Sequence, residues 1–289
     1  MARNVRLALV QMRYAGSRDK TLDAAARMIT EAAADGAQVV CLQELFASPY
    51  PCQSEDHRNF DYAEDVPGTT TDVLSSLAKK HELVIVAPLF ERRGPGMYHN
   101  SAIVLDADGS VAGMYRKMHI PDDPLFYEKF YFAPGDLGFQ PITTRYAKLG
   151  VGVCWDQWFP EAARLFALAG AEILLYPTAI GWIADEKAEF GQSQHDAWRT
   201  NMRAHAIANG LWLGAPNRVG IESELEFWGQ SFIASPRGEV VAEAGVRDEC
   251  VLIADCCLDE IDVVRTHWPF LRDRRIDAYD GLLKRWIDS

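Results

Sequence analysis

The segment NSAIVLDADGSV, residues 100–111, decides how the rest of the chain is interpreted. Apolar runs flank its turn, Asp106-Ala107-Asp108-Gly109, and this pattern predicts a β-hairpin. Residues 229–240, GQSFIASPRGEV, have the same plan around the turn Ser235-Pro236-Arg237-Gly238. The two segments therefore look like two copies of one hairpin.

The elements around the two hairpins recur in a similar order. A strand-helix-strand-helix-hairpin plan used twice predicts two sheets with helices on their outer faces. The sequence thus predicts an α/β fold, a four-layer α/β/β/α sandwich with two pseudo-symmetric halves. The expected strands are 5–10, 37–42, 83–90, 149–153, 172–176, 211–215 and 251–254, and the expected helices are 19–34, 69–80, 160–169 and 192–209.

The composition is that of a folded protein with a large core. The chain has 289 residues, of which 48% are hydrophobic and 24% charged, and these values argue against disorder. It contains no linker-like or low-complexity stretch. We expect one domain over residues 1–265 and a C-terminal extension over residues 266–289, which packs on that domain or on a neighbouring subunit.

Charge and hydropathy exclude several kinds of partner. The formal net charge of −12 disfavours nucleic acid and anionic membranes, because both require clustered Lys and Arg, and it suits a cationic small molecule. No apolar run approaches the roughly 20 residues of a membrane span. The apolar start at 5–12 is too short for a signal peptide, and a secreted disulfide framework is not expected. We therefore expect a cytoplasmic protein with reduced thiols.

Cys154 is the strongest candidate for a nucleophile. It ends the apolar run LGVGVC, and Pro160 shortly afterwards suits the first turn of a helix, so the thiol is expected at a strand-turn-helix corner. Backbone amides and the helix dipole would favour a thiolate there and stabilise an oxyanion. The alternative interpretation is a buried structural cysteine.

Two charged residues could support this thiol. Lys117, in GMYRKMHIP, could lower the pKa of a nearby thiol and hold negative charge on a tetrahedral oxygen. Glu44 follows an apolar strand and could take the thiol proton if burial raised its pKa. Taken alone, Lys117 could equally be a solvated surface residue and Glu44 an ordinary loop glutamate.

Glu128 and His119 widen the choice. Glu128, an acid among aromatic residues in FYEKFYF, could orient Lys117 or bind a substrate NH2 group, or could be a structural ion-pair partner. His119 lies two residues after Lys117, and a Cys–His pair is the commoner nucleophile arrangement. The chemistry of these residues alone does not choose between Glu44 and His119 as the base.

No metal or cofactor is expected from the sequence. The adjacent pair Cys256-Cys257, even with His267, lacks the Cys-x-x-Cys spacing of zinc sites. Gly150 and Gly152 precede the candidate nucleophile without a third glycine, so a phosphate-cradling motif is missing.

Three segments in order resemble the nitrilase-like carbon–nitrogen hydrolases over nearly the whole chain. They are CLQELF around Glu44, YRKMHIP around Lys117 and GVGVCWDQWFPEAAR around Cys154. The resemblance implies the α/β/β/α sandwich, a Glu-Lys-Cys triad made of these three residues, and a second glutamate at Glu128. It also implies that Glu44, rather than His119, is the base.

Longer segments resemble the branch of that family that hydrolyses N-carbamoylputrescine. They are KMHIPDDPLFYEKFYFAPGD, CWDQWFPEAAR, PTAIG and HWPFLRDRRIDAY, whereas WIADEKAEFGQ after Gly181 departs from the branch. The resemblance implies a small cationic ureido substrate, a covalent Cys intermediate and a step of polyamine biosynthesis. Carboxylates or aromatic rings would bind the ammonium end and the methylene chain. The candidates are Tyr50, Trp155, Asp185 and Glu189, followed by Trp182, Glu186, Glu222, Glu224 and Glu226.

Other functions remain open at this point. A β-ureidopropionase would place Arg or Lys in the pocket for its anionic substrate, and an aliphatic amidase is a further alternative. A catalytically silent assembly subunit is the non-enzymatic interpretation, and the intact triad argues against it. The resemblance also implies a homo-oligomer, a dimer or larger. The interface candidates are Trp158, Phe159, Phe166 and the tail 268–279.

Overall fold

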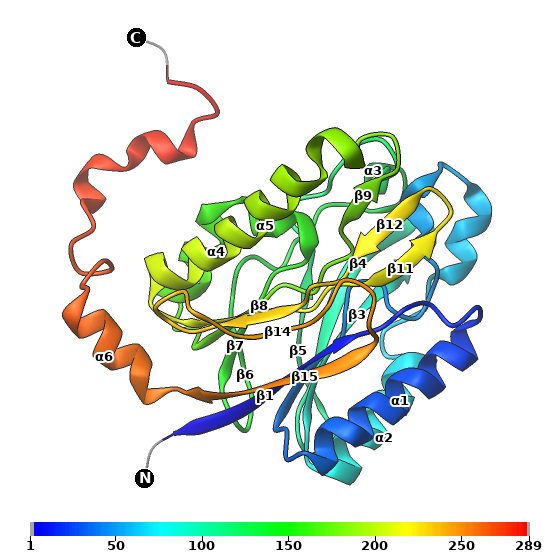
Figure 1. Ribbon diagram of the computed structural model, residues 1–289, viewed down its shortest axis with the longest axis horizontal. Coiled ribbons are helices and arrows are strands. Elements are labelled where there is room, and N and C mark those ends of the chain that lie inside the picture. The colour runs from blue at the N-terminus through cyan, green and yellow to red at the C-terminus, as the bar shows by residue number, and fades with distance from the viewer. Residues whose placement is uncertain (1–2, 288–289) are drawn as a thin grey trace.

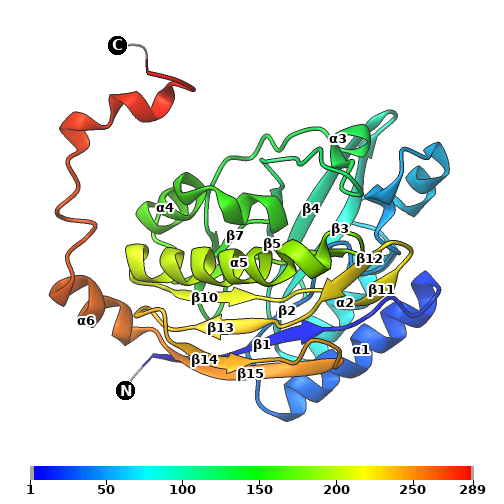
Figure 2. The same cartoon turned by 45° about the horizontal axis from the view of Figure 1, so that its top comes forward.

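The computed structural model describes residues 3–287 and has four layers (Figure 1). Two six-stranded sheets pack face to face, and a pair of helices covers the outer face of each sheet (Figure 2). This arrangement confirms the predicted α/β/β/α sandwich. Among the residues that the structure describes, no helix has the length and apolar character needed to cross a membrane.

The first sheet is built mainly from the first half of the chain. Its three parallel strands are followed by the first predicted hairpin, and the last strand of the chain joins its edge antiparallel to β1. Its elements are β1 (Asn4–Gln11), β2 (Val39–Cys41), β3 (Val84–Gly94), β4 (Met97–Leu105), β5 (Val111–Arg116) and β15 (Cys250–Cys257), with helices α1 (Arg18–Ala34) and α2 (Thr69–His81).

The second sheet repeats this plan. Three parallel strands are again followed by a hairpin, and one short strand extends the edge. Its elements are β6 (Ile142–Thr143), β7 (Lys148–Val151), β8 (Ile173–Leu175), β10 (Trp212–Ala215), β13 (Phe232–Ala234) and β14 (Val240–Glu243), with helices α4 (Pro160–Leu168) and α5 (Lys187–Asn209). The repetition confirms the two pseudo-symmetric halves.

The side chains of β1 show how the layers are held together. Because successive residues of a strand point to opposite faces, Leu7 and Leu9 join the core between the two sheets, whereas Ala8 and Val10 pack with α1 and α2. Ser17 caps the start of α1 by accepting a hydrogen bond from the Lys20 N–H. The strand is therefore buried on both faces, which explains its nearly continuous apolar sequence.

Some elements were not predicted from the sequence. A small third sheet contains β9 (Gly181–Ile183), β11 (Val219–Glu222) and β12 (Leu225–Trp228), and α3 (Glu128–Tyr131) is a single turn. The turn between β11 and β12 places Ser223 at a positive φ of 53°. Hairpin turns with positive φ usually carry Gly or Asn, so the sequence Ser223-Glu224 gave no hairpin signal.

The C-terminal part of the chain leaves the sandwich. Helix α6 spans Asp259–His267, so the predicted boundary at 265/266 falls inside a helix. Beyond it, the tail with the short 3-10 helices η4 (Ile276–Ala278) and η5 (Asp280–Leu283) extends away from the body (Figures 1 and 2). Whether it packs on a neighbouring subunit stays a prediction.

Candidate active site

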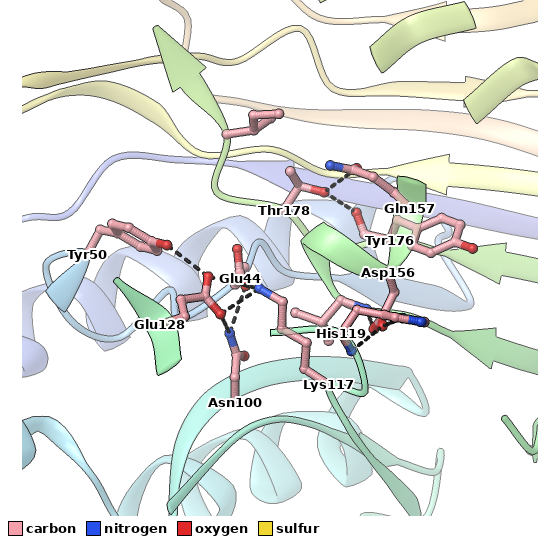
Figure 3. Close-up of polar contacts among 12 residues, drawn as sticks. Glu44, Tyr50, Asn100, Lys117, His119, Glu128, Asp156, Gln157, Tyr176 and Thr178 are labelled. Carbon is pink, nitrogen blue, oxygen red and sulfur yellow. Dashed lines mark hydrogen bonds and ion pairs between the residues drawn. The ribbon is translucent and has the colours of Figure 1, made fainter. Parts of the chain in front are cut away.

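Three charged residues that are far apart in the sequence meet at one end of the first sheet. Glu44 follows β2, Lys117 follows β5, and Glu128 begins α3. The Lys117 Nζ donates hydrogen bonds of 2.8 Å to Oε1 of Glu44 and of 2.7 and 2.9 Å to the two oxygens of Glu128 (Figure 3). All three side chains are buried. The structure thus brings together three of the four predicted catalytic residues as a hydrogen-bonded cluster.

Lys117 stays charged in this cluster despite its burial. Burial alone would lower the pKa of its ammonium, but the carboxylates of Glu128 and Glu44 outweigh that effect and raise the pKa well above its ordinary value. A permanent positive charge is therefore held at the base of the site, where it can stabilise a developing oxyanion.

Glu128 differs from an ordinary carboxyl group. Burial raises its pKa to about 7; Lys117 acts against this and Glu44 adds to it. The Tyr50 hydroxyl donates a 2.8 Å hydrogen bond to Oε1 of Glu128. Glu128 thus holds Lys117 in place through both of its oxygens.

The two oxygens of Glu44 have different environments. Oε1 accepts hydrogen bonds from Lys117 and from Asn100 Nδ2, the latter at 2.7 Å. Oε2 is buried and has no hydrogen-bond partner among the described residues. Oε2 is consequently the oxygen that is available to accept a proton.

Cys154 lies at a strained corner directly after the second sheet. It follows β7, its φ is +40°, and its N–H donates to the Pro177 carbonyl at 2.9 Å. Positive φ is uncommon for a residue with a Cβ, and it occurs where the surrounding structure enforces it. The corner turns the thiol into a cavity that it shares with Glu128.

The expected strand-turn-helix corner is confirmed: β7 ends at Val151, the turn is the 3-10 helix η3 (Cys154–Trp158), and α4 begins at Pro160. Burial, and then the negative charge of Glu44, raise the pKa of the thiol well above its ordinary value, although Lys117 opposes the shift. The resting thiol is therefore protonated, and an attack on a substrate requires a base.

Asp156 fixes this corner. Its Oδ2 accepts hydrogen bonds from the Val153 N–H at 2.9 Å and the Tyr115 hydroxyl at 2.8 Å, and its Oδ1 accepts from the His119 N–H at 3.0 Å. The His119 ring also contacts Asp156 Oδ1 through Nδ1, at 2.7 Å, and stacks on Phe159. These contacts use the His119 ring to support the corner, which favours Glu44 as the base.

A cavity of about 370 Å³ opens over Cys154. Three acidic residues line it, and no Lys or Arg of the described chain does. Its lining consists of Pro121, Asp123, Pro124, Phe126, Glu128, Cys154, Trp155, Trp158, Ile180, Gly181, Ile183, Glu186, Gln194, Ala197 and Trp228. The cavity lining is thus mainly apolar, and its charged residues are acidic, with Glu128 paired to Lys117 beneath it.

The predicted substrate-binding residues have different positions. Trp155 lines the cavity, as expected of a binding residue. Tyr50 is buried beneath it and contacts Glu128 rather than the open space. Asp185 and Glu189 are exposed and lie outside the lining, whereas Glu186, between them, is part of it. The sequence named all three acids as candidates, because spacing alone does not tell which side chains of a loop point inward.

Asn100 and Asp123 were missed as site residues. Asn100 is the first residue of the hairpin segment that revealed the fold, and a polar residue next to a run of apolar strand residues was the available signal. Asp123 follows Asp122 in a loop with two prolines, where no periodic pattern indicates which acid faces the cavity. Among the described residues, no group of three or more His, Cys, Asp and Glu side chains is arranged to hold a metal ion.

A four-layer sandwich with a buried Glu-Lys-Cys site at one end of its sheets defines the class of nitrilase-like amide hydrolases. The family model described as carbon-nitrogen hydrolase matches residues 6–266. The chain belongs to the carbon–nitrogen hydrolase family, and it is an amidohydrolase.

Three similar proteins illustrate the range of relatives. An N-carbamoylputrescine amidase of Solanum lycopersicum is 47% identical over 268 residues, which cover 90% of this chain and 88% of the relative. A citrullinase of Francisella tularensis subsp. tularensis is 40% identical and covers 98% of this chain and 99% of the relative. The crystal structure of a carbon–nitrogen hydrolase from Helicobacter pylori G27 is 50% identical, with a TM-score of 0.95 over 98% of this chain and 100% of that chain.

Proposed function

We propose that this protein hydrolyses N-carbamoylputrescine to putrescine, carbon dioxide and ammonia, a step of polyamine biosynthesis. The observation that carries the proposal is the acidic lining of the cavity over Cys154, where Asp123 and Glu186 face no Lys or Arg of the described lining, while the charge of Glu128 is balanced by Lys117. Such a cavity suits a ureido group attached to an ammonium. It does not suit 3-ureidopropionate, whose carboxylate would be left unpaired.

The proposed reaction uses Cys154 as nucleophile and Glu44 as base. Oε2 of Glu44 takes the thiol proton while the sulfur attacks the ureido carbonyl carbon, and Lys117 stabilises the negative oxygen, aided by a backbone N–H such as that of Trp155. Glu44 then returns the proton to the departing nitrogen as the C–N bond breaks. This leaves a thioester on Cys154.

Water completes the cycle. Glu44 accepts a proton from a water molecule, whose oxygen attacks the thioester carbonyl and releases the Cys154 thiol. The product is a carbamic acid, which decomposes to carbon dioxide and an amine. The protonated resting thiol fits this scheme, because Glu44 is needed in both halves of the reaction.

Glu186 is the best candidate for binding the distal ammonium. It is half-buried in the cavity wall, and its Oε2 accepts a long hydrogen bond of 3.4 Å from Gln194 Nε2. The indole rings of Trp155, Trp158 and Trp228 offer apolar surface for a methylene chain. We place the ammonium at Glu186 instead of at Asp185 and Glu189.

A substrate panel tests the proposal, with ammonia release as the readout. N-carbamoylputrescine should be turned over with a far higher kcat/KM than 3-ureidopropionate or citrulline. Citrulline has a comparable ureido end but adds a carboxylate, so it separates this function from that named for the Francisella relative. A higher kcat/KM for the anionic 3-ureidopropionate or for the zwitterionic citrulline would contradict the proposal.

Substitution of Glu186 tests the ammonium site. Glu186→Gln should lower kcat/KM for N-carbamoylputrescine by roughly 10- to 100-fold, mostly through KM, because a charged hydrogen bond is worth about 1.5–3 kcal/mol. Glu189→Gln, at an exposed position in the first turn of α5, is the matched control and should match the wild type. N-carbamoylbutylamine, which lacks the ammonium, should not distinguish Glu186→Gln from wild type; an equal loss on this substrate would refute the assignment.

The chain is also proposed to act in the cytoplasm as a homo-oligomer. Leu165 and Leu168 of α4 are 45% and 46% exposed, and Leu282 and Leu283 of the tail are 61% and 94% exposed. These residues face a cavity of about 700 Å³ between α4, α5 and the tail. Apolar surface of this kind is typical of a surface that a second copy covers.

A further inference from the structure

Asn100 stands at the centre of the buried charge cluster although it carries no charge. Its Nδ2 donates a 2.7 Å hydrogen bond to Oε1 of Glu44 and a longer one of 3.4 Å to Oε2 of Glu128. Its backbone carbonyl accepts a 2.8 Å hydrogen bond from the Lys117 N–H. One residue therefore contacts both carboxylates and the residue that carries the ammonium (Figure 3).

The position of Asn100 in the fold restricts what it can do. It belongs to β4, opposite Phe90 of β3, and it is fully buried. It is not part of the cavity lining, and its side-chain N–H group is directed to Glu44 and Glu128. Any effect of its side chain on the reaction must pass through Glu44 or Glu128.

The amide of Asn100 supplies a hydrogen-bond donor to the carboxylates without adding a charge. Lys117 can neutralise only part of the charge of two neighbouring carboxylates, and a second cation would be costly to bury. A neutral N–H donor stabilises the carboxylate of Glu44 without adding charge. Because it occupies Oε1, it leaves Oε2 as the free oxygen.

We infer that Asn100 is a positioning residue of the hydrolase: it fixes the orientation of Glu44 so that Oε2 is free to exchange protons with Cys154 and water. The inference rests on the proposed role of Glu44 as base. The titratable groups of the cluster come from several elements. They are Glu44 after β2, Tyr50 and Cys52 at η1 (Pro51–Gln53), Lys117 after β5, Glu128 in α3 and Cys154 in η3.

Asn100→Leu tests the donor, since it removes the hydrogen bonds at similar side-chain size. The kcat should fall by roughly 10- to 100-fold with little change in KM, because one charge-assisted hydrogen bond is lost and the cavity is untouched. The acid limb of the kcat/KM profile should also move to higher pH, since a carboxylate without its donor holds a proton more readily.

Asn100→Asp gives a signature that a structural role does not produce. A protonated Asp carboxyl can donate a hydrogen bond in place of the amide, whereas an ionised one cannot and adds repulsion. The variant should therefore approach wild-type kcat at acidic pH and lose activity through a new ionisation as pH rises.

Asn209→Leu is the matched control. Asn209 is another buried amide, but it lies at the end of α5 and its Nδ2 donates only to the His205 carbonyl. This variant should keep the wild-type pH profile even if it loses stability in denaturant unfolding. Wild-type kcat and profile in folded Asn100→Leu, or a profile of Asn100→Asp without the new ionisation, would overturn the inference. If Asn100→Leu does not fold, the pH profile of Asn100→Asp tests the inference by itself.

Measurements on the wild-type protein distinguish a wrong substrate from a wrong role of Asn100. Wild-type protein that ignores N-carbamoylputrescine but hydrolyses another amide or ureido compound would refute the substrate, and the Asn100 variants would then be measured on that compound.

Discussion

At the scale of single residues, the site shows how a charged cluster can be buried. Two unpaired buried carboxylates would be costly, and here each accepts hydrogen bonds from Lys117 and from Asn100. Within this cluster, Oε2 of Glu44 and Oδ1 of Asn100 are buried and have no hydrogen-bond partner among the described residues. Because Oε2 of Glu44 has no hydrogen-bond partner in the described part of the chain, it can accept the proton of the Cys154 thiol once a substrate is bound.

The choice of base can be tested by two substitutions. Glu44→Gln should lower kcat by roughly a thousandfold or more, because the amide cannot accept and return the proton. His119→Asn keeps a polar contact for Asp156 and should stay within about tenfold of wild type. Steady-state ammonia release measures both. A larger loss in His119→Asn than in Glu44→Gln would reverse the assignment.

At the scale of elements, the corner from β7 into η3 is the part that most limits the geometry. Asp156 ties the corner to the end of β5 through Tyr115 and His119, and it closes the corner on itself through Val153. These bonds offset the positive φ of Cys154, because they leave the corner little freedom to relax. The proposed nucleophile is thus held by a residue outside the cavity lining.

Asp156→Asn should be strongly destabilising. An amide can accept fewer of these hydrogen bonds, and it points a donor at other donors, so a loss of about 3 kcal/mol in the free energy of unfolding is expected. Denaturant unfolding measures it, and Asp280→Asn, an exposed residue of the tail, is the control. A folded variant with wild-type stability and kcat would mean that the corner does not depend on this carboxylate.

The elements also show what the sequence could and could not predict. The repeated hairpin predicted the sandwich, because two copies of one motif require two equivalent sheets. Glu44, Lys117 and Cys154 each follow a predicted strand, and strand ends gather at one edge of a sheet. The third sheet escaped prediction because the turn at Ser223 lacks glycine. Glu186 was among the predicted acids, but a loop has no period that could single it out as one that faces the cavity.

At the scale of the whole molecule, the protruding tail and α4 leave apolar surface uncovered. We expect light scattering at micromolar concentration to show a dimer or a larger assembly. The double substitution Leu165→Asp and Leu168→Asp should reduce its size, because burying two carboxylates at an apolar contact is unfavourable. Met97→Asp, at an exposed hairpin turn, should not. A wild-type monomer would contradict the proposed oligomer.

The cavity combines two sets of segments that can change independently. Glu44, Lys117 and Cys154 follow strands of the two main sheets, whereas the far wall comes from β9, α5 and β12 through Gly181, Ile183, Glu186, Gln194, Ala197 and Trp228. Mutations in that wall can alter the accepted molecule without disturbing bond cleavage. A change of substrate specificity therefore requires few substitutions outside that wall. Exchanging the 181–197 segment between relatives is a direct route to redesigning the specificity of this enzyme.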